Sequence, residues 1–531
     1  MNKLMMSIPV LAVQGAFAAS ERPNILFILS DDHGAHSMSC YGCKINKTPN
    51  MDALAKNGVK LNRVYATNPI CAPSRACILT GMYSHKNGVP SFSSIDNKIK
   101  TVGGYMRDAG YYTAIIGKWH LGKGKTVRDS DWDKWAIYDG LGQYKNPWFY
   151  ERDPATGKIV ENHFKDEHCT ENLTKRCKQE LDVALASGKP FFMMMTHKAP
   201  HAPCVPTERN RGRFWSLKLS DVPPPETFLD DFSGRSSALP QTHCQMDDLG
   251  TQTLKIGDWY NAGHVFEFEG KKYYPKKNKK GLYKNDWPED MPKGSRQRRY
   301  FNYLRFIQDY LATVQDIDDS IGEMVQYLKD KGVYENTLVI YTSDQGFFLG
   351  DHGMWGKRYM FEQTMKMPFV ASWPRGIKPG TVSDALCVNE DFAPTFIDLA
   401  GGRVPESMQG FSLAPIFRGE TPKDWRQVVY GRGYVEGGWK HTAAWNGVKT
   451  AQGDELINYY KRGEWEYYDL KSDKNEVKNR YDDPACAKRI AELKEEIIRQ
   501  KKLLDDNDEF IDATETDPYG KKKDKEQKQP T

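Results

Sequence analysis

Five short runs of apolar residues restrict the fold of this chain more than any other feature of its sequence. Each run is apolar throughout, without alternating polar residues, which is typical of strands buried on both faces of a parallel sheet. The runs are Asn24 to Leu29, Tyr112 to Ile116, Phe191 to Met195, Thr337 to Tyr341 and Pro368 to Ser372. Helical patterns lie between them, and this alternation predicts an α/β fold: a large mixed, mostly parallel sheet with helices on both faces.

The clearest helical pattern is an apolar stripe that stops at Gly332, shortly before the fourth run. Its residues recur at helical spacing and are Leu304, Ile307, Leu311, Val314, Ile317, Ile321, Val325 and Leu328. Residues 205–300 are rich in Pro, Gly, Lys and Asp, so we expect a long insertion there. The aromatic stretch Tyr430 to Leu470, punctuated by glycines, predicts a small antiparallel sheet, and Lys488 to Leu504 predicts an amphipathic helix.

The first twenty residues have the pattern of an export signal, with Lys3, an apolar stretch from Met5 to Val13 and a small-residue cleavage site at Ala16 to Ala18. An unprocessed N-terminus is the alternative. No later stretch reaches the roughly 20 apolar residues of a membrane span, so we expect a secreted or periplasmic protein. The net charge of +5 does not indicate nucleic acid as a partner. Cys40 and Cys43 form either a local disulfide or two free thiols.

Residues of catalytic types follow four of the runs. Ligands bind beyond the carboxyl ends of strands in open parallel sheets, so we expect these side chains to meet at one edge. They are Asp31 and Asp32 after the first run, Lys118 and His120 after the second, His197 and His201 after the third, and Asp344 and Gln345 after the fourth. The carboxylates and the amide offer only oxygen ligands, which suits calcium or magnesium. The alternative for the Asp31–Asp32 pair is a helix N-cap.

The segment Cys71-Ala72-Pro73-Ser74-Arg75, followed by Thr80-Gly81, is the most specific motif in the chain. It resembles the signature of the type I sulfatases, in which a maturation enzyme oxidises the first cysteine to formylglycine (3-oxoalanine). We expect Pro73 to start a helix with Cys71 at its N-terminal end, where an anion is stabilised. The resemblance extends from about residue 22 to residue 480.

The resemblance implies a calcium site and a modified nucleophile. The implied ligands are Asp31, Asp32, Cys71, Asp344 and Gln345, although many relatives carry Asn where this chain has the longer Gln345. Formylglycine at position 71 hydrates to a diol, and one of its hydroxyl groups attacks the sulfur of a sulfate ester. The second hydroxyl allows the enzyme-bound sulfate to be expelled.

The resemblance also implies roles for the remaining polar residues. Arg75 steadies the diol, while Lys118 and Lys357 hold the sulfate oxygens. His201 protonates the leaving alcohol, either alone or together with Lys357, and His120 then takes the proton of the second hydroxyl.

Further candidates for contact with the substrate are His197 and His352, each with a structural role as the alternative, and then Asp351 and Arg358. The implied substrate is a sulfated carbohydrate, a glycosaminoglycan or mucin sugar such as 6-O-sulfated N-acetylglucosamine. The alternatives are a phosphatase or phosphonate monoester hydrolase of the same superfamily, and an inactive glycan-binding protein.

The fold implied by the resemblance is alkaline-phosphatase-like, and the length of 531 residues is itself too great for one ordinary core. We predict four parts: a signal peptide at 1–20, a sulfatase catalytic domain at 21–400, a C-terminal α+β subdomain at 401–515 and a charged tail at 516–531.

Overall fold

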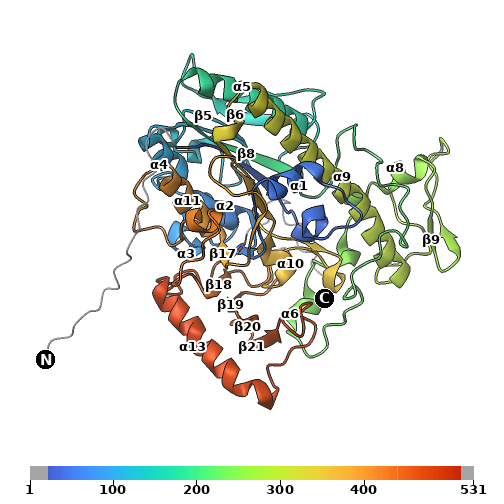
Figure 1. Cartoon of the computed structure of the whole chain (residues 1–531). Coiled ribbons are helices and arrows are strands. Elements are labelled where there is room, and N and C mark those ends of the chain that lie inside the picture. Colours follow the sequence, from blue (N-terminus) through green and yellow to red (C-terminus); the bar gives the residue numbers. More distant parts are fainter. Residues whose placement is uncertain (1–21, 439, 516–531) are drawn as a thin grey trace, which may run out of the picture.

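The computed structural model describes residues 22–438 and 440–515 (Figure 1). The predicted signal peptide and charged tail lie outside these residues. Ten strands form the main sheet: β1 (Asn24–Asp31), β2 (Val59–Leu61), β4 (Tyr112–Lys118), β5 (Lys134–Tyr138), β6 (Trp148–Arg152), β7 (Ile159–His163), β8 (Phe191–Pro200), β11 (Thr337–Ser343), β15 (Phe369–Ser372) and β16 (Thr381–Ser383). Their order across the sheet is β16-β2-β15-β11-β1-β8-β4-β5-β6-β7.

The central strands of this sheet, from β11 to β5, all run parallel. Antiparallel pairs lie on both sides of them, so the sheet is mixed and mostly parallel at its centre, as predicted. One prediction was wrong in direction, because the run Pro368 to Ser372 forms β15, which pairs antiparallel with β11. Apolar composition indicates burial but not direction, and the segment between these strands lacks the long helix of a parallel crossover.

Helices cover both faces of the main sheet, as predicted. Leu26 and Ile28 of β1 lie in one core with α1 (Pro49–Lys56), α5 (Cys169–Ala186) and α9 (Arg296–Asp330). The intervening residues Ile25, Phe27 and Leu29 lie in a second core with α2 (Cys71–Thr80), α4 (Val102–Asp108) and α11 (Phe392–Leu399). Alternate side chains of one strand thus enter two cores, which is why the run is apolar throughout.

The helix predicted from the apolar stripe is α9, which runs from Arg296 to Asp330 and is confirmed. The Ser295 side chain accepts a hydrogen bond from the Arg298 N–H at the start of the helix, and Gly332 has φ 71° just after its end. Each helix of the described residues is too short or too polar to span a lipid bilayer.

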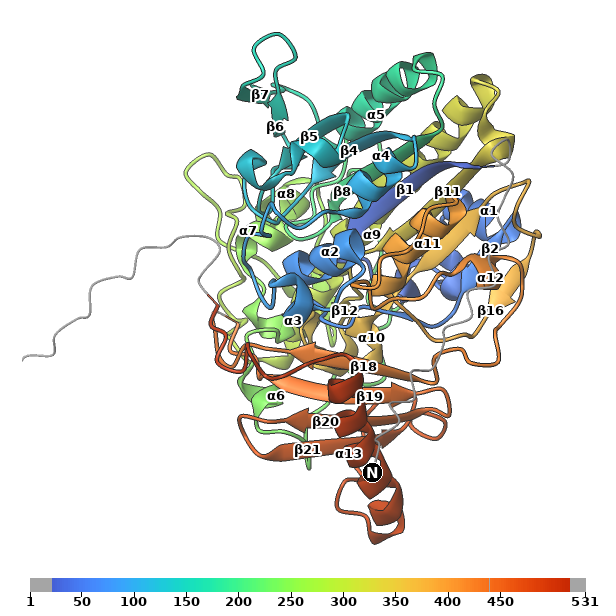
Figure 2. The ribbon, with the colours of Figure 1, turned by 90° about the vertical axis from the view of Figure 1, so that its left-hand side faces the viewer.

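Before α9 begins at Arg296, the insertion at 205–300 contains only short elements: α6 (Ala238–Gln241), η5 (Met246–Asp248), α7 (Thr251–Leu254), α8 (Ile256–Asn261), and the hairpin of β9 (Phe266–Phe268) and β10 (Lys271–Tyr273). The predicted C-terminal antiparallel sheet consists of β18 (Val428–Gly433), β19 (Trp445–Thr450), β20 (Asp454–Tyr459) and β21 (Glu464–Asp469). Helix α13 (Ala487–Leu503) packs against it, and Figure 2 shows this sheet below the main one.

Smaller elements connect these parts. They are α3 (Ser84–Asn87), α10 (Glu362–Met365), α12 (Ala414–Phe417), the pair β12 (Phe348–Leu349) and β13 (Trp355–Gly356), and the three-stranded sheet of β3 (Val64–Tyr65), β14 (Lys366–Met367) and β17 (Cys387–Val388). All ten cysteines lie in the described part of the chain and are free thiols, Cys40 and Cys43 included.

Candidate active site

The carboxyl ends of the central strands carry the polar residues that the sequence indicated. Asp31 ends β1, Lys118 ends β4, and Asp344 directly follows β11. His201 directly follows β8. Figure 2 shows α2 between the main sheet and the C-terminal sheet. Segments more than three hundred residues apart in the chain therefore meet at one edge, because parallel neighbours end on the same side.

Cys71 is the first residue of α2, and every residue of that helix is buried. The helix starts at Cys71 and not at Pro73 as predicted, since proline is tolerated anywhere in the first turn, where N–H groups have no helical partner. Cys71 thus lies at the positive end of the helix dipole. Its Sγ is 3.6 Å from Asp32 Oδ1, and ligand atoms of Asp31, Asp32, Cys71 and His201 lie within 4.8 Å of one another.

Three buried cations pair with the three buried carboxylates at this edge. Lys118 Nζ contacts Asp31, Lys357 Nζ lies 2.5 and 2.6 Å from the two oxygens of Asp32, and Arg75 Nε lies 2.9 Å from Asp344 Oδ2. Arg75 also donates to the carbonyl oxygen of Lys118 at 2.8 Å. Charges this deeply buried require such partners, so the residues form one electrostatic unit.

Two of the three carboxylates of this unit, Asp32 and Asp344, are harder to ionise than an ordinary aspartate. Burial raises the pKa of Asp344 to about 7, and the charge of Asp31 adds to the rise. Burial also raises the pKa of Asp32, although Lys357 opposes it. Burial alone would raise the pKa of Asp31, but Lys118 and the other cations around it hold that pKa well below its usual range. A further positive charge beside these carboxylates would favour the ionised form of all three.

The Cys71 thiol is a poor nucleophile in this setting. Burial raises its pKa well above the ordinary value, and the charge of Asp31 raises it further. Cysteine reacts as the thiolate, so an unmodified thiol here would be almost entirely protonated and unreactive.

The oxygen atoms of the site fit a hard cation. Asp31 Oδ1 and Gln345 Oε1 are buried and have no hydrogen-bond partner among the described residues, which is rare for buried acceptors. Gln345 Nε2 contacts Asp32 and lies 3.7 Å from Cys71 Sγ, so the longer amide does reach this edge. Carboxylate and amide oxygens are the ligands that calcium takes in proteins, and Asp31, Asp32, Asp344 and Gln345 could hold it.

Two histidines flank these carboxylates. His201 Nε2 lies 3.4 Å from Asp32 Oδ2. The His120 ring packs against Phe92, with 5.2 Å between ring centroids. Burial lowers the pKa of both imidazoles well below the ordinary value, so both are neutral at neutral pH and able to accept a proton.

The other two predicted histidines do not contact the Asp31–Asp32–Cys71–His201 group. Both ring nitrogens of His197 are buried without a partner among the described residues. His352 Nδ1 lies 2.7 Å from Asp230 Oδ2 and 3.3 Å from Arg235. Their roles in substrate binding stay predictions.

Two supporting residues could not be found from the sequence. The Ser74 hydroxyl donates to the carbonyl oxygen of Asp344, which ties α2 to the end of β11. The Tyr310 hydroxyl donates to the carbonyl oxygen of Asp32 at 2.8 Å and accepts from the Gly34 N–H at 3.0 Å. Tyr310 lies within the apolar part of α9, where an aromatic residue indicates only a core position.

Comparisons with known proteins agree with this arrangement. The family model described as Sulfatase matches residues 23–402, which include every residue of the site described above. The chain belongs to the sulfatase family. The resemblance noted in the sequence is confirmed, and the protein is a sulfuric ester hydrolase. A second model, described as the C-terminal part of N-sulphoglucosamine sulphohydrolase, matches residues 350–503 of this sulfatase.

The sulfatase resembles several characterised proteins along most of its length. It is 36% identical over 508 residues to N-acetylglucosamine-6-O-sulfatase from Bacteroides thetaiotaomicron, covering 92% of this chain and 88% of the relative. It is 26% identical to the ulvan-active sulfatase of Formosa agariphila, over 78% of this chain and 61% of the relative. The structure of BT4656 with its substrate D-glucosamine-2-N,6-O-disulfate superposes with a TM-score of 0.80 at 33% identity, covering 92% of this chain and 99% of BT4656. The predicted fold class is confirmed.

Proposed function

We propose that this sulfatase removes the 6-O-sulfate from glucosamine-type sugars of glycosaminoglycans or mucins, using formylglycine made from Cys71 and a bound calcium ion. The observation that carries the chemistry is the position of Cys71, within 4.8 Å of Asp31, Asp32 and His201 at the N-terminus of a buried helix. The proposed substrate is supported by the similarity to N-acetylglucosamine-6-O-sulfatase and by the disulfated glucosamine in the BT4656 complex.

Both cofactors have a place in this arrangement. Asp31, Asp32, Asp344 and Gln345, together with the modified residue 71, would hold calcium, and the ion would supply Lewis-acid stabilisation of charge on oxygen. Hydrated formylglycine would supply the hydroxyl nucleophile that the buried thiol cannot.

The remaining side chains bind the sulfate and move protons. Lys118 and Lys357 are turned toward Asp31 and Asp32 and would bind sulfate oxygens once a cation neutralises those carboxylates. His201 would protonate the leaving alcohol, since the negative sulfate ester favours its protonated form, and His120 would accept a proton in the second step.

Maturation and export complete the proposal. Cys71 is only 1% exposed, so a maturation enzyme would have to read the motif before the chain folds. Residues 1–20 would act as the export signal for a secreted or periplasmic enzyme.

A panel of esters tests the proposal, with released sulfate measured by ion chromatography. The panel contains 6-O-sulfated N-acetylglucosamine, 6-O-sulfated N-acetylgalactosamine, glucosamine-2-N,6-O-disulfate, an aryl sulfate and an aryl phosphate. We expect kcat/KM for the two glucosamine sugars to exceed the others by at least about tenfold, because a site that hydrogen-bonds particular hydroxyls discriminates strongly. Faster hydrolysis of the aryl phosphate, or no sulfate release from any sugar, would overturn the assignment.

A further inference from the structure

Arg358, the neighbour of Lys357, is held in a conformation that costs energy. Its φ is 101°, in the left-handed region that favours glycine, and its side chain is only 4% exposed. The Trp445 indole N–H donates to the carbonyl oxygen of Arg358 at 2.8 Å, so the C-terminal sheet helps to hold this backbone. Strain of this kind persists mostly where the surrounding structure holds a residue in one place.

The guanidinium group of Arg358 lies over the ring of Phe92, which also packs against His120. Its Cζ is 5.3 Å from the centre of the Phe92 ring, and the same ring is 5.2 Å from that of His120. Arg358 and His120 thus pack against the same aromatic ring at the border of the site.

A second cation, Lys440, lies near enough to Arg358 and Lys357 for their charges to affect it. Lys440 Nζ lies 4.1 Å from the centre of the Trp355 ring. Burial lowers the pKa of Lys440 to about 8, and the positive charges of Arg358 and Lys357 lower it further. Lys357, Arg358 and Lys440 thus form a patch of positive potential, of which only Lys357 faces the carboxylates of the catalytic site.

The chain itself supplies an anion to this patch. Both carboxylate oxygens of Glu515 approach Arg358 Nη1, at 2.8 and 3.1 Å, and the Glu515 side chain is fully buried. Glu515 reaches Arg358 from 157 residues away in the chain, beyond α13. Because the buried Arg358 guanidinium binds a buried carboxylate, this position accepts an anion with oxygen acceptors.

We propose that Arg358 and Lys440 form a second anion subsite, which binds the N-sulfate of a 2-N,6-O-disulfated glucosamine while the 6-O-sulfate occupies the catalytic site. In the absence of substrate the carboxylate of Glu515 takes this subsite and is displaced when the sugar binds. The planar guanidinium offers parallel N–H donors that match two oxygens of a sulfate as well as those of a carboxylate. The inference rests on the proposed function, since it assumes hydrolysis of 6-O-sulfated glucosamine.

The test is the ratio of kcat/KM for glucosamine-2-N,6-O-disulfate to kcat/KM for 6-O-sulfated N-acetylglucosamine, measured on the full enzyme. Arg358→Gln should lower this ratio by about tenfold or more, the loss expected for one hydrogen bond between charged groups. Glu515→Gln should raise the ratio, because a neutral amide competes less well for Arg358. Arg403→Gln is the matched control, since Arg403 pairs with Glu406 on the surface, where the two side chains are 84% and 91% exposed.

The outcomes separate this inference from the proposed function. An unchanged ratio in both Arg358→Gln and Glu515→Gln, with both sugars still hydrolysed, would overturn the subsite alone. If wild-type enzyme hydrolyses neither sugar, the proposed function fails first. If Arg358→Gln does not fold, Glu515→Gln and Lys440→Gln test the subsite in its place. The ratio should rise in Glu515→Gln and fall in Lys440→Gln, and any other result would overturn the subsite.

Discussion

Two residues at the carboxyl edge of the central strands hold backbone conformations that residues other than glycine rarely adopt. Asp32 has φ 68° and His120 has φ 59°, and each lies just beyond the end of a parallel strand. In these conformations the Asp32 carboxylate forms an ion pair with Lys357, and the His120 ring packs against Phe92. Residue type and position predicted that both side chains would lie at this edge, but not the strained turns that orient them.

Removing the charge of Asp344 tests the cation site. Asp344→Asn should lower kcat/KM by about 100-fold or more, because Lewis-acid stabilisation is worth several kcal/mol. Excess calcium should restore part of the loss by mass action.

Wild-type enzyme dialysed against a chelator should lose activity and regain it when calcium is returned. Full activity after exhaustive chelation, checked by elemental analysis of the dialysed protein, would show that no metal takes part.

At the scale of elements, the strands could be predicted because a strand buried on both faces is an unbroken apolar run. The long helix could be predicted because a helix buried on one face carries an apolar stripe. The direction of β15 could not, since apolar composition is the same for parallel and antiparallel strands. The insertion at 205–300 has little periodicity, so the sequence predicts an insertion there but not its short helices and hairpin. The polar residues that gather at the carboxyl ends of the central strands could be predicted from strand ends and one motif, whereas Ser74 and Tyr310 act through hydroxyl groups that carry no spacing signal.

A buried carboxyl group, that of Glu390, lies beside helix α2. Asn389 donates to the Ser74 hydroxyl at 2.9 Å, and next to it the Thr67 hydroxyl donates to Glu390 Oε1 at 2.5 Å. Burial raises the pKa of Glu390 from 4.5 to about 7. The folded protein therefore keeps this proton over a range in which the unfolded chain releases it.

This proton makes stability depend on pH. The stabilisation is fully present below pH 4.5 and is lost as the pH rises to about 7. The loss amounts to about 3 kcal/mol, from about 1.4 kcal/mol for each pKa unit. Glu390→Gln should flatten the fall in the free energy of unfolding over this range, measured by urea denaturation at a series of pH values. Parallel curves for variant and wild type would contradict the assignment.

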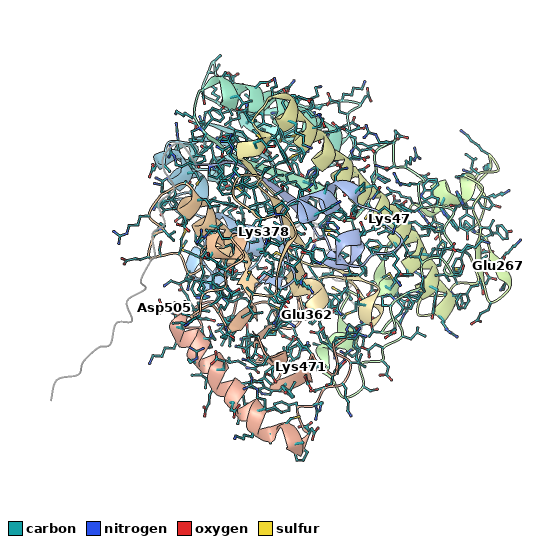
Figure 3. The ribbon with its side chains drawn as sticks, in the orientation of Figure 1. Lys47, Glu267, Glu362, Lys378, Lys471 and Asp505 are labelled. Atoms are coloured by element: carbon teal, nitrogen blue, oxygen red, sulfur yellow. The ribbon has the colours of Figure 1, made fainter. Side chains whose placement is uncertain are left out.

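For the whole molecule, a buried ion group joins the main part of the chain to the C-terminal sheet. Lys449 of β19 contacts Glu455 of β20 and lies 3.1 Å from Glu476 and 3.3 Å from Glu362 of α10. Both oxygens of Glu476 also accept from the Glu362 N–H at 3.0 Å. Figure 3 shows Glu362 above Lys471, which follows β21, and the two line one cavity. One cation thus holds three carboxylates at this junction.

Lys449→Met should destabilise the protein by about 3–5 kcal/mol, because it leaves buried carboxylates without their cation. Thermal unfolding followed by circular dichroism measures the effect. Lys461→Met, which removes a cation paired with the exposed Asp512, is the control and should change stability by less than about 1 kcal/mol. Equal shifts for the two variants would show that the junction does not depend on Lys449.

The chemical state of residue 71 decides whether this enzyme can work as proposed. Mass spectrometry of the peptide that carries it, from enzyme produced with a maturation enzyme, measures that state directly. We expect an aldehyde in place of the thiol, in proportion to the specific activity of each preparation, and no turnover in Cys71→Ala. A fully active preparation whose peptide carries only the unmodified cysteine would contradict the account.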